Sequence, residues 1–187
     1  MIRFAKKEDG PMIAPLVLVI LKDMELDFLK EVPETLLLTI LEEAAANPDY
    51  RYGYKRGLVY ELDNKVVGIA FGYPAEDESV IDEPLRQILI KYGLDMNLQL
   101  FIDEETLPGE WYLDSIAVDE AYRGYGIGSK LLDSLPEMAE KAGKSVIGLS
   151  VDKMNPDARR LYERKGFKDV AERMISGHLY DHMQKKI

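Results

Sequence analysis

Apolar and polar residues follow one another along the first third of the chain in patterns that predict one short strand and two helices. Ile2–Ala5 is typical of a strand. The apolar run Met12–Leu21 predicts a buried core helix, and its helical spacing continues to Lys30. Pro33 interrupts the pattern, because proline removes a helical hydrogen bond. A second helix is then expected over Glu34–Ala46.

The next segments predict a β-hairpin. Gly57–Leu62 and Lys65–Tyr73 are joined by the polar pair Asp63-Asn64, a good two-residue turn. Lys65–Tyr73 is apolar on both faces, so we expect this strand to be covered on both sides. Three tyrosines at strand spacing, Tyr50, Tyr52 and Tyr54, predict a half-buried strand edge, and they could alternatively line an acceptor site.

The second half of the chain opens with a segment of different character. Pro74–Pro108 is acidic and lacks strand alternation, with one helix-like piece over Pro84–Tyr92, and we interpret it as an insertion over one face of the sheet. After it the pattern predicts, in order, the strand Glu110–Val118, a glycine-rich turn, the helix Ser129–Ala142, the strand Ser145–Val151, the helix Asn155–Lys165, and two strands within Phe167–Gln184 turning at Ser176-Gly177. One domain, residues 1–187, accounts for this mixed α/β order.

Charge and cysteine content narrow the classes of function. The 187 residues include 34 acidic and 24 basic side chains, giving a net charge of −10, which argues against nucleic-acid binding and suits a cationic partner. There is no cysteine, so disulfides, thiolate metal sites and a cysteine nucleophile are excluded. That composition fits a reducing cytoplasm. Met12–Leu21 is about half as long as the ~20 residues of a membrane-spanning helix, so no membrane association is expected.

The most informative segment is the turn Arg123–Gly128 (RGYGIG), which joins a strand to a helix. Glycines let the backbone approach a ligand, and the helix N-terminus attracts an anion such as a pyrophosphate. Two common phosphate motifs do not fit. The dinucleotide fingerprint needs a different glycine spacing and an acidic residue where Val146 stands, and a P-loop needs the reverse order of Ser129-Lys130.

The turn resembles the Arg/Gln-x-x-Gly-x-Gly/Ala loop of the GCN5-related N-acetyltransferases, the GNAT superfamily. Arg123, Gly126 and Gly128 occupy its defined positions. A second segment, Asn155–Phe167 (NPDARRLYERKGF), resembles the family signature N-x-x-A-x-x-L-Y-x-x-x-G-F at every named position. The two motifs occur in the order that the family shows, each in the expected strand–turn–helix context.

This resemblance implies a fold and a donor. The fold is an α/β (α+β) arrangement with a mixed, mostly antiparallel sheet flanked by helices, and a V-shaped splay between the strand before the loop and the next strand. The donor is acetyl-CoA, acting as cosubstrate without a metal, and the reaction is acyl transfer to a primary amine by direct attack. The residues expected to bind the donor are Ile116, Ala117, Val118, Arg123, Gly124, Tyr125, Gly126, Ile127, Gly128, Ser129, Lys130, Asn155 and Tyr162.

Three chemical tasks need residues: deprotonation of the ammonium, stabilisation of the oxyanion and protonation of the departing thiolate. By resemblance Tyr162 is the general acid and a backbone N–H near Val118 holds the oxyanion. Tyr162 could instead only pack on the cofactor or on the sheet. Asp114 and Glu110 are both candidates for the base. On a regular strand they share a face with Tyr112, Ile116 and Val118. Asp114 could instead bind the substrate cation, or simply be neutralised by neighbouring groups.

Several alternatives stay open. Asn155 could contact the donor or only cap its helix. His178 and His182 lack a third clear ligand, so we expect no metal site. The acceptor is a cationic amine whose identity the sequence leaves undefined. Many proteins of this fold dimerise, sometimes through the C-terminal strands. The alternative function is a non-catalytic acyl-CoA-binding sensor or scaffold, which would keep the loop and lose the chemistry.

Overall fold

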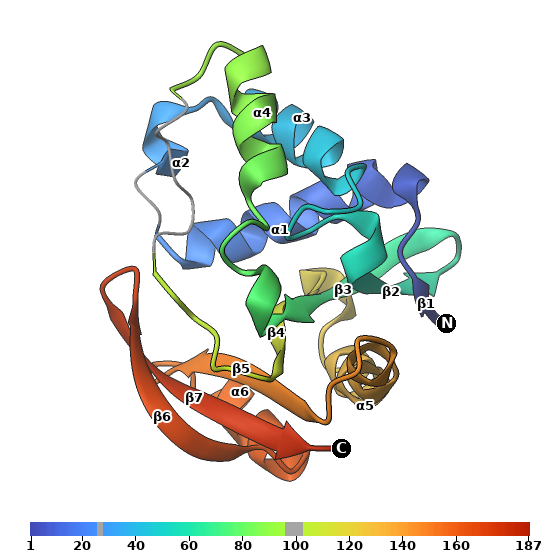
Figure 1. Cartoon of the computed structure of the whole chain (residues 1–187). Helices are drawn as coiled ribbons and strands as arrows, with labels where there is room; N and C mark the ends of the chain where they lie inside the picture. The colour runs from blue at the N-terminus through green and yellow to red at the C-terminus, as the bar shows by residue number, and fades with distance from the viewer. Residues whose placement is uncertain (26–27, 96–102) are drawn as a thin grey trace.

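The computed structural model describes residues 1–25, 28–95 and 103–187. Its strands form one seven-stranded sheet in the order β1-β2-β3-β4-β5-β7-β6 (Figure 1). The strands are β1 (Ile2–Phe4), β2 (Gly57–Leu62), β3 (Lys65–Pro74), β4 (Trp111–Val118), β5 (Val146–Asp152), β6 (Lys168–Ile175) and β7 (His178–Lys186). Neighbouring strands run antiparallel except β4 and β5, which are parallel. The mixed, mostly antiparallel sheet implied by the family resemblance is confirmed.

Helices cover both faces of this sheet (Figure 1). The α-helices are α1 (Gly10–Asp23), α2 (Phe28–Glu31), α3 (Glu34–Ala45), α4 (Glu83–Lys91), α5 (Ile127–Lys141) and α6 (Pro156–Arg164), and the short 3₁₀ helices are η1 (Lys7–Asp9), η2 (Tyr54–Arg56), η3 (Ala75–Asp77) and η4 (Glu120–Tyr122). Buried residues of α1, α3 and α4 form one apolar core with one face of the sheet. Buried residues of α5 form a second core with the other face, which Tyr162 of α6 joins. No helix in the described ranges is long and apolar enough to span a bilayer.

Local sequence signals explain two of the turns. Asp63 and Asn64 both take positive φ, +49° and +61°, as a type I′ hairpin turn requires, and the predicted hairpin is confirmed. Helix α5 begins two residues earlier than expected, at Ile127. Gly126 precedes it with a φ of +74°, a left-handed conformation that glycine adopts without steric cost.

The first helix is shorter than its periodicity predicts. Helix α1 ends at Asp23, and the chain then turns at Met24 and Glu25, where Glu25 has a φ of +53°. Helix α2 is a separate short element, and Leu26, which the prediction placed in the helix, lies outside the described residues. The prediction of a continuous helix to Lys30 was therefore wrong.

The three tyrosines at strand spacing do not form an edge strand. Tyr50 and Tyr52 lie fully buried in a turn after α3, and Tyr54 begins η2. The rings of Tyr50 and Tyr52 meet edge to face at 5.6 Å, and Tyr52 meets Phe71 of β3 in the same way at 5.7 Å. Edge-to-face packing is favourable for aromatic rings and draws these side chains into the core.

The acidic segment Pro74–Pro108 is described as far as residue 95 and again from residue 103. Its helix α4 contributes Leu85, Ile88 and Leu89 to the core that contains α1 and α3. Figure 1 shows α4 beside α3, so this part of the segment extends the helical layer on that face.

Strand β4 contains the irregularity that matters for the site. Its register with β3 pairs Phe71 with Ser115 but Gly72 with Leu113, so Asp114 is the extra residue of a β-bulge. A bulge shifts the alternation of side chains, and the regular faces predicted for this strand are wrong beyond it. Residues on both sides of the bulge therefore pack in the core beside α5, namely Trp111, Leu113, Ile116 and Val118.

Strands β4 and β5 separate just where the bulge occurs. Their pairing runs from Trp111 opposite Ile147 to Leu113 opposite Leu149 and goes no further in the described residues. Beyond Leu113 the edge of β4 that faces β5 is unpaired, which is the V-shaped splay implied by the family resemblance. This fold feature is confirmed.

Candidate active site

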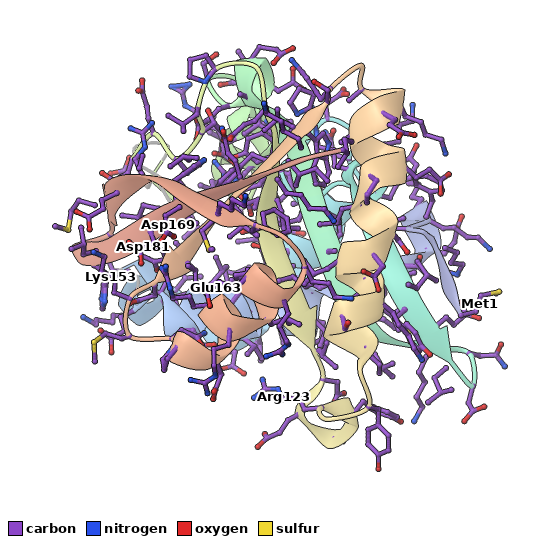
Figure 2. The ribbon with its side chains drawn as sticks, turned by 90° about the horizontal axis from the view of Figure 1, so that it is seen from below. Met1, Arg123, Lys153, Glu163, Asp169 and Asp181 are labelled. Carbon is purple, nitrogen blue, oxygen red and sulfur yellow. The ribbon has the colours of Figure 1, made fainter. Side chains whose placement is uncertain are left out.

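The glycine turn forms one wall of a cavity at the N-terminus of α5. Gly124 and Gly126 have φ values of +84° and +74°, and a Cβ built on either would meet no atom within 4 Å. No side chain caps α5, so the first N–H groups of the helix remain available to an anion. Figure 2 shows Arg123 at this loop between β4 and α5. The cavity measures about 570 Å³ and is lined by Val118, Tyr122, Arg123, Gly124, Gly126, Ile127, Gly128, Ser129, Leu161, Arg164 and Lys165.

Seven of the residues expected to bind the donor thus line one cavity. The other six expected residues do not line this cavity. Tyr125 is 74% exposed, and the ammonium of Lys130 lies 5.6 Å from the ring centroid of Tyr60. Ile116 and Ala117 lie on β4, beyond the cavity's lining. The prediction missed Tyr122, Leu161, Arg164 and Lys165, and the basic pair Arg164-Lys165 at the end of the second motif was the available signal.

Helix α6 holds the second motif. The side chain of Asn155 accepts a hydrogen bond from the backbone N–H of Ala158 at 3.1 Å, so its capping role is confirmed. Tyr162 is 8% exposed and packs edge to face against Phe167 at 6.1 Å. Burial raises the pKa of Tyr162 to about 12. Its hydroxyl makes no hydrogen bond to any described residue, so it is free to donate one to a ligand.

A second, smaller cavity lies where β4 and β5 separate. It measures about 110 Å³ and combines apolar residues of α1, β6 and the turn after α1 with polar groups, several of them from the two strands. Its lining residues are Ile20, Met24, Tyr52, Glu105, Tyr112, Asp114, Ser115, Ser150, Ile175 and Tyr180.

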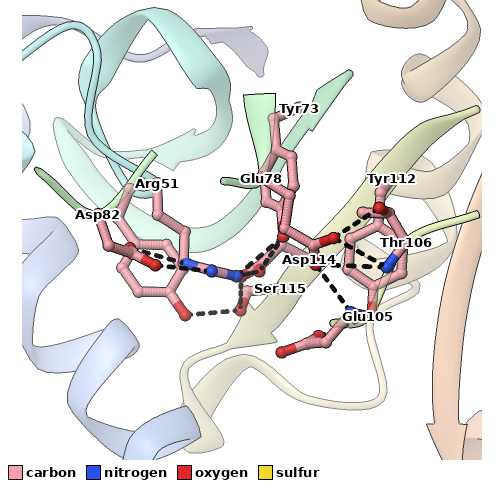
Figure 3. Close-up of polar contacts among 10 residues, drawn as sticks. Arg51, Tyr73, Glu78, Asp82, Glu105, Thr106, Tyr112, Asp114 and Ser115 are labelled. Atoms are coloured by element: carbon pink, nitrogen blue, oxygen red, sulfur yellow. Dashed lines mark hydrogen bonds and ion pairs between the residues drawn. The ribbon is translucent and has the colours of Figure 1, made fainter. Parts of the chain in front are cut away.

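Asp114, one of the two predicted bases, is neutralised by a buried arginine that the sequence reasoning missed. Figure 3 shows Arg51 between Asp114 and Asp82. Arg51 pairs with Asp114, and its Nη2 donates to Asp82 at 2.8 Å. Ser115 donates a further hydrogen bond to Asp114 at 2.8 Å.

Arg51 keeps its charge in this network. Burial alone would lower the pKa of Arg51, but the negative charges beside it, chiefly Asp114, hold that pKa well above its ordinary value. The only sequence signal for this pairing was a lone arginine between Tyr50 and Tyr52. Nothing in the local pattern identified Asp114, 63 residues away, as its partner.

Glu110, the other predicted base, lies in a separate buried contact at the start of β4. Its carboxylate accepts hydrogen bonds from the backbone N–H of Leu107 at 2.8 Å and from Gln184 Nε2 at 2.7 Å. His182 Nε2 lies 3.1 Å from it, and both side chains are fully buried. Glu110 is absent from the lining of the splay cavity.

His178, the other histidine, lies 3.6 Å or more from Asp152 and Glu25. Among the described residues, no group of three or more histidines and carboxylates comes together as metal ligands would.

Glu105 faces the splay cavity and was not singled out by the sequence analysis. It lies just before β4, is 7% exposed, and accepts a hydrogen bond from the hydroxyl of Tyr112 at 2.8 Å. Burial, reinforced by the charge of Asp114, raises the pKa of Glu105 to about 7. Its only sequence signal was membership of the acidic segment.

An acidic groove of about 600 Å³ lies beside this network. Its lining includes five carboxylates and two arginines, with residues Arg51, Ala75, Glu76, Glu78, Ser79, Asp82, Asp103, Glu104, Thr106, Pro108, Gly109 and Arg173. The excess of negative charge favours a cation at this surface.

Comparison with known proteins agrees with the geometry. The model of the acetyltransferase (GNAT) family matches residues 20–167. A crystal structure of an acetyltransferase superposes with a TM-score of 0.93 at 63% identity, covering 100% of this chain and 99% of the other. The N-acetyltransferase from Staphylococcus aureus Mu50 gives a TM-score of 0.85 at 32% identity, covering 99% and 100%.

Relatives known from their sequences match over shorter stretches. An acetyltransferase of Agrobacterium fabrum is 37% identical over 110 residues, which are 51% of this chain and 79% of the relative. A thialysine N-epsilon-acetyltransferase of Bos taurus is 35% identical over 99 residues, 52% of this chain and 55% of the relative. The chain thus spans about half of the cattle enzyme. With the family match covering most of its length, this chain belongs to the acetyltransferase (GNAT) family and is an acetyl-CoA-dependent N-acetyltransferase.

Proposed function

We propose that the protein transfers the acetyl group of acetyl-CoA to a primary amine by direct attack within a ternary complex. The observation that carries this proposal is the placement of two cavities along one strand. Val118 at the end of β4 lines the glycine-turn cavity, and Asp114 and Ser115 line the splay cavity. Four residues of strand separate Val118 from Asp114, about 13 Å.

In this proposal the turn holds the pyrophosphate, and the pantetheine arm follows the unpaired edge of β4 past Ile116, Ala117 and Val118. The arm then delivers the thioester to the splay. Unpaired N–H groups on this edge supply the donor for the oxyanion. Of the predicted donor-binding residues, Tyr125 and Lys130 would contribute at the rim of the turn, and Asn155 through the part of its amide that capping leaves available.

Tyr162 is proposed as the general acid. Its raised pKa and its free hydroxyl keep it protonated and able to donate to a departing thiolate. The absence of cysteine supports direct attack, because no thiol can carry an acyl-enzyme.

The acceptor is proposed to be an unbranched primary ammonium. The splay cavity is small, its apolar walls include Ile20, Met24 and Ile175, and carboxylates lie at its polar end. The acidic groove nearby would attract a second positive charge on a longer acceptor. The cattle relative is named for transfer to the ε-amino group of thialysine, which agrees with such an acceptor.

Initial-rate kinetics test the mechanism. Acetyl-CoA is varied at several concentrations of an unbranched diamine, and release of free thiol is recorded. Direct attack predicts double-reciprocal lines that intersect. Parallel lines, the pattern of a covalent acyl-enzyme, would contradict it. Binding of acetyl-CoA without thiol release for any amine would instead favour the sensor or scaffold.

A further inference from the structure

The proposed reaction needs a group that removes a proton from the incoming ammonium. Neither predicted base is suited to this task. Asp114 is neutralised by Arg51, and Glu110 is enclosed by His182, Gln184 and the backbone of Leu107. Both oxygens of each carboxylate therefore already have a partner, with Ser115 on the second oxygen of Asp114.

Glu105 occupies a more suitable position. It lines the splay cavity together with Tyr112 and Asp114 of β4 and Ser150 of β5. A ligand that reaches the splay along β4 therefore meets this carboxylate. Figure 3 shows Glu105 next to Thr106, with its backbone N–H directed at Glu78.

The carboxylate of Glu105 is held at one oxygen and open at the other. Oε2 accepts the hydrogen bond from Tyr112, whereas Oε1 has no hydrogen-bond partner anywhere in the described ranges. Hydrogen bonds to Glu78 also hold the chain at Glu105 and Thr106 in place. The N–H of Glu105 donates to Glu78 at 2.8 Å, and the hydroxyl of Thr106 donates to the same carboxylate at 2.6 Å. This is a preorganised acceptor with one free oxygen.

The surrounding charges favour proton uptake near neutral pH. Burial raises the pKa of Glu105 to about 7, and Asp114 and Glu78 add to the effect. Arg51 and the hydrogen bond from Tyr112 oppose it. From β7, Tyr180 lines the same cavity, and burial raises its pKa to about 12, so that hydroxyl stays neutral. A base is most effective when its pKa lies near the working pH.

We propose that Glu105 is the catalytic base, taking a proton on its free oxygen from a primary ammonium bound in the splay cavity. The inference rests on the proposed function. The nitrogen lone pair so released attacks the acetyl carbonyl carbon, the C–N bond forms, and the C–S bond breaks with its electron pair on sulfur. Tyr162 gives a proton to that sulfur, and the second proton lost by nitrogen restores Tyr162. The products are the N-acetyl amine, the free thiol and one proton, which leaves Glu105 for solvent.

The test compares Glu105→Gln with wild type and with a control, Glu83→Gln. Glu83 is an exposed carboxylate of α4, outside the machinery described here, so its variant removes the same charge. The measurement is kcat/KM for a primary diamine between about pH 6 and about pH 9. Wild type and E83Q are expected to show the same rise through about pH 7. E105Q is expected to lose about 100-fold or more at neutral pH.

The shape of the profile separates a base from a structural residue. In E105Q the rise near pH 7 should be replaced by a steady tenfold increase per pH unit, because the reaction then depends on the fraction of free amine in solution. Acetyl-CoA affinity should stay at the wild-type value. Glu105→Asp, which keeps the carboxyl group, should recover part of the rate together with the original rise.

The experiment distinguishes failure of the Glu105 assignment from failure of the proposed function. Wild-type kcat/KM and an unchanged pH profile in E105Q would overturn the assignment of Glu105 and leave the proposed function standing. No amine-dependent thiol release by the wild type would overturn the proposed function, and this inference with it.

Discussion

The donor side and the acceptor side of this molecule are built in different ways. The glycine turn and α6, which form the donor side, are each made of consecutive residues within a single motif. The acceptor side joins Arg51, Asp82, Glu105 and Asp114, which come from four separate parts of the chain. The donor side is therefore encoded locally, and the acceptor side exists only once the chain has folded.

The largest expected effect concerns the buried ion pair on the acceptor side. Arg51→Met leaves Asp114 buried without its cation, and losing one member of such a pair costs about 3–5 kcal/mol of unfolding free energy. Urea denaturation measures this loss. The double variant Arg51→Met, Asp114→Asn should recover part of it, and equal stability of wild type and R51M would contradict the structural role given to the pair.

Tyr162→Phe tests the proposed general acid on the donor side. Removing the hydroxyl should lower kcat by about 100-fold, or ~2.7 kcal/mol in the barrier, because the departing thiolate loses its acid. The affinity for acetyl-CoA should not change, since the ring and its contact with Phe167 are kept. Calorimetric titration with acetyl-CoA provides the control, and an unaltered kcat would remove Tyr162 from the mechanism.

Glu105 on the acceptor side should make the stability of the protein depend on pH. Because the pKa of folded Glu105, about 7, lies above the ordinary glutamate value of 4.5, this group lowers stability as pH rises between those values. Glu105→Gln removes the effect and should stabilise the protein at pH 8 by about 3 kcal/mol, with little change near pH 4. Thermal unfolding at both pH values measures this. Equal gains at both would show that Glu105 carries no raised pKa.

A matched glycine pair tests the turn itself. Gly126 and Gly143 have φ values of +74° and +71°, so alanine at either position strains the backbone by about 1–2 kcal/mol. Only Gly126 lines the donor cavity. Gly126→Ala should weaken acetyl-CoA binding by about tenfold, or ~1.4 kcal/mol, whereas Gly143→Ala should leave it unchanged. Equal affinities in the two variants would mean that the turn does not hold the donor.

The contrast between the two sides also explains what the sequence could predict. Nearly every strand and helix followed from periodicity, and the turn and α6 followed from motifs whose residues are neighbours in the chain. The bulge at Asp114 could not be predicted, because it depends on the register between β3 and β4. The Arg51–Asp114 pair spans 63 residues, and no local pattern specifies such a contact. Glu105 was hidden among other carboxylates of an acidic segment, where only burial distinguishes it.

The most direct test of the proposed acetyl transfer is a free-thiol release assay on the wild-type protein with acetyl-CoA, with and without an unbranched primary diamine. We expect thiol release that depends on the amine and yields its N-acetyl product. Acetyl-CoA binding with no amine-dependent release, for the diamine or for any other primary amine, would contradict it.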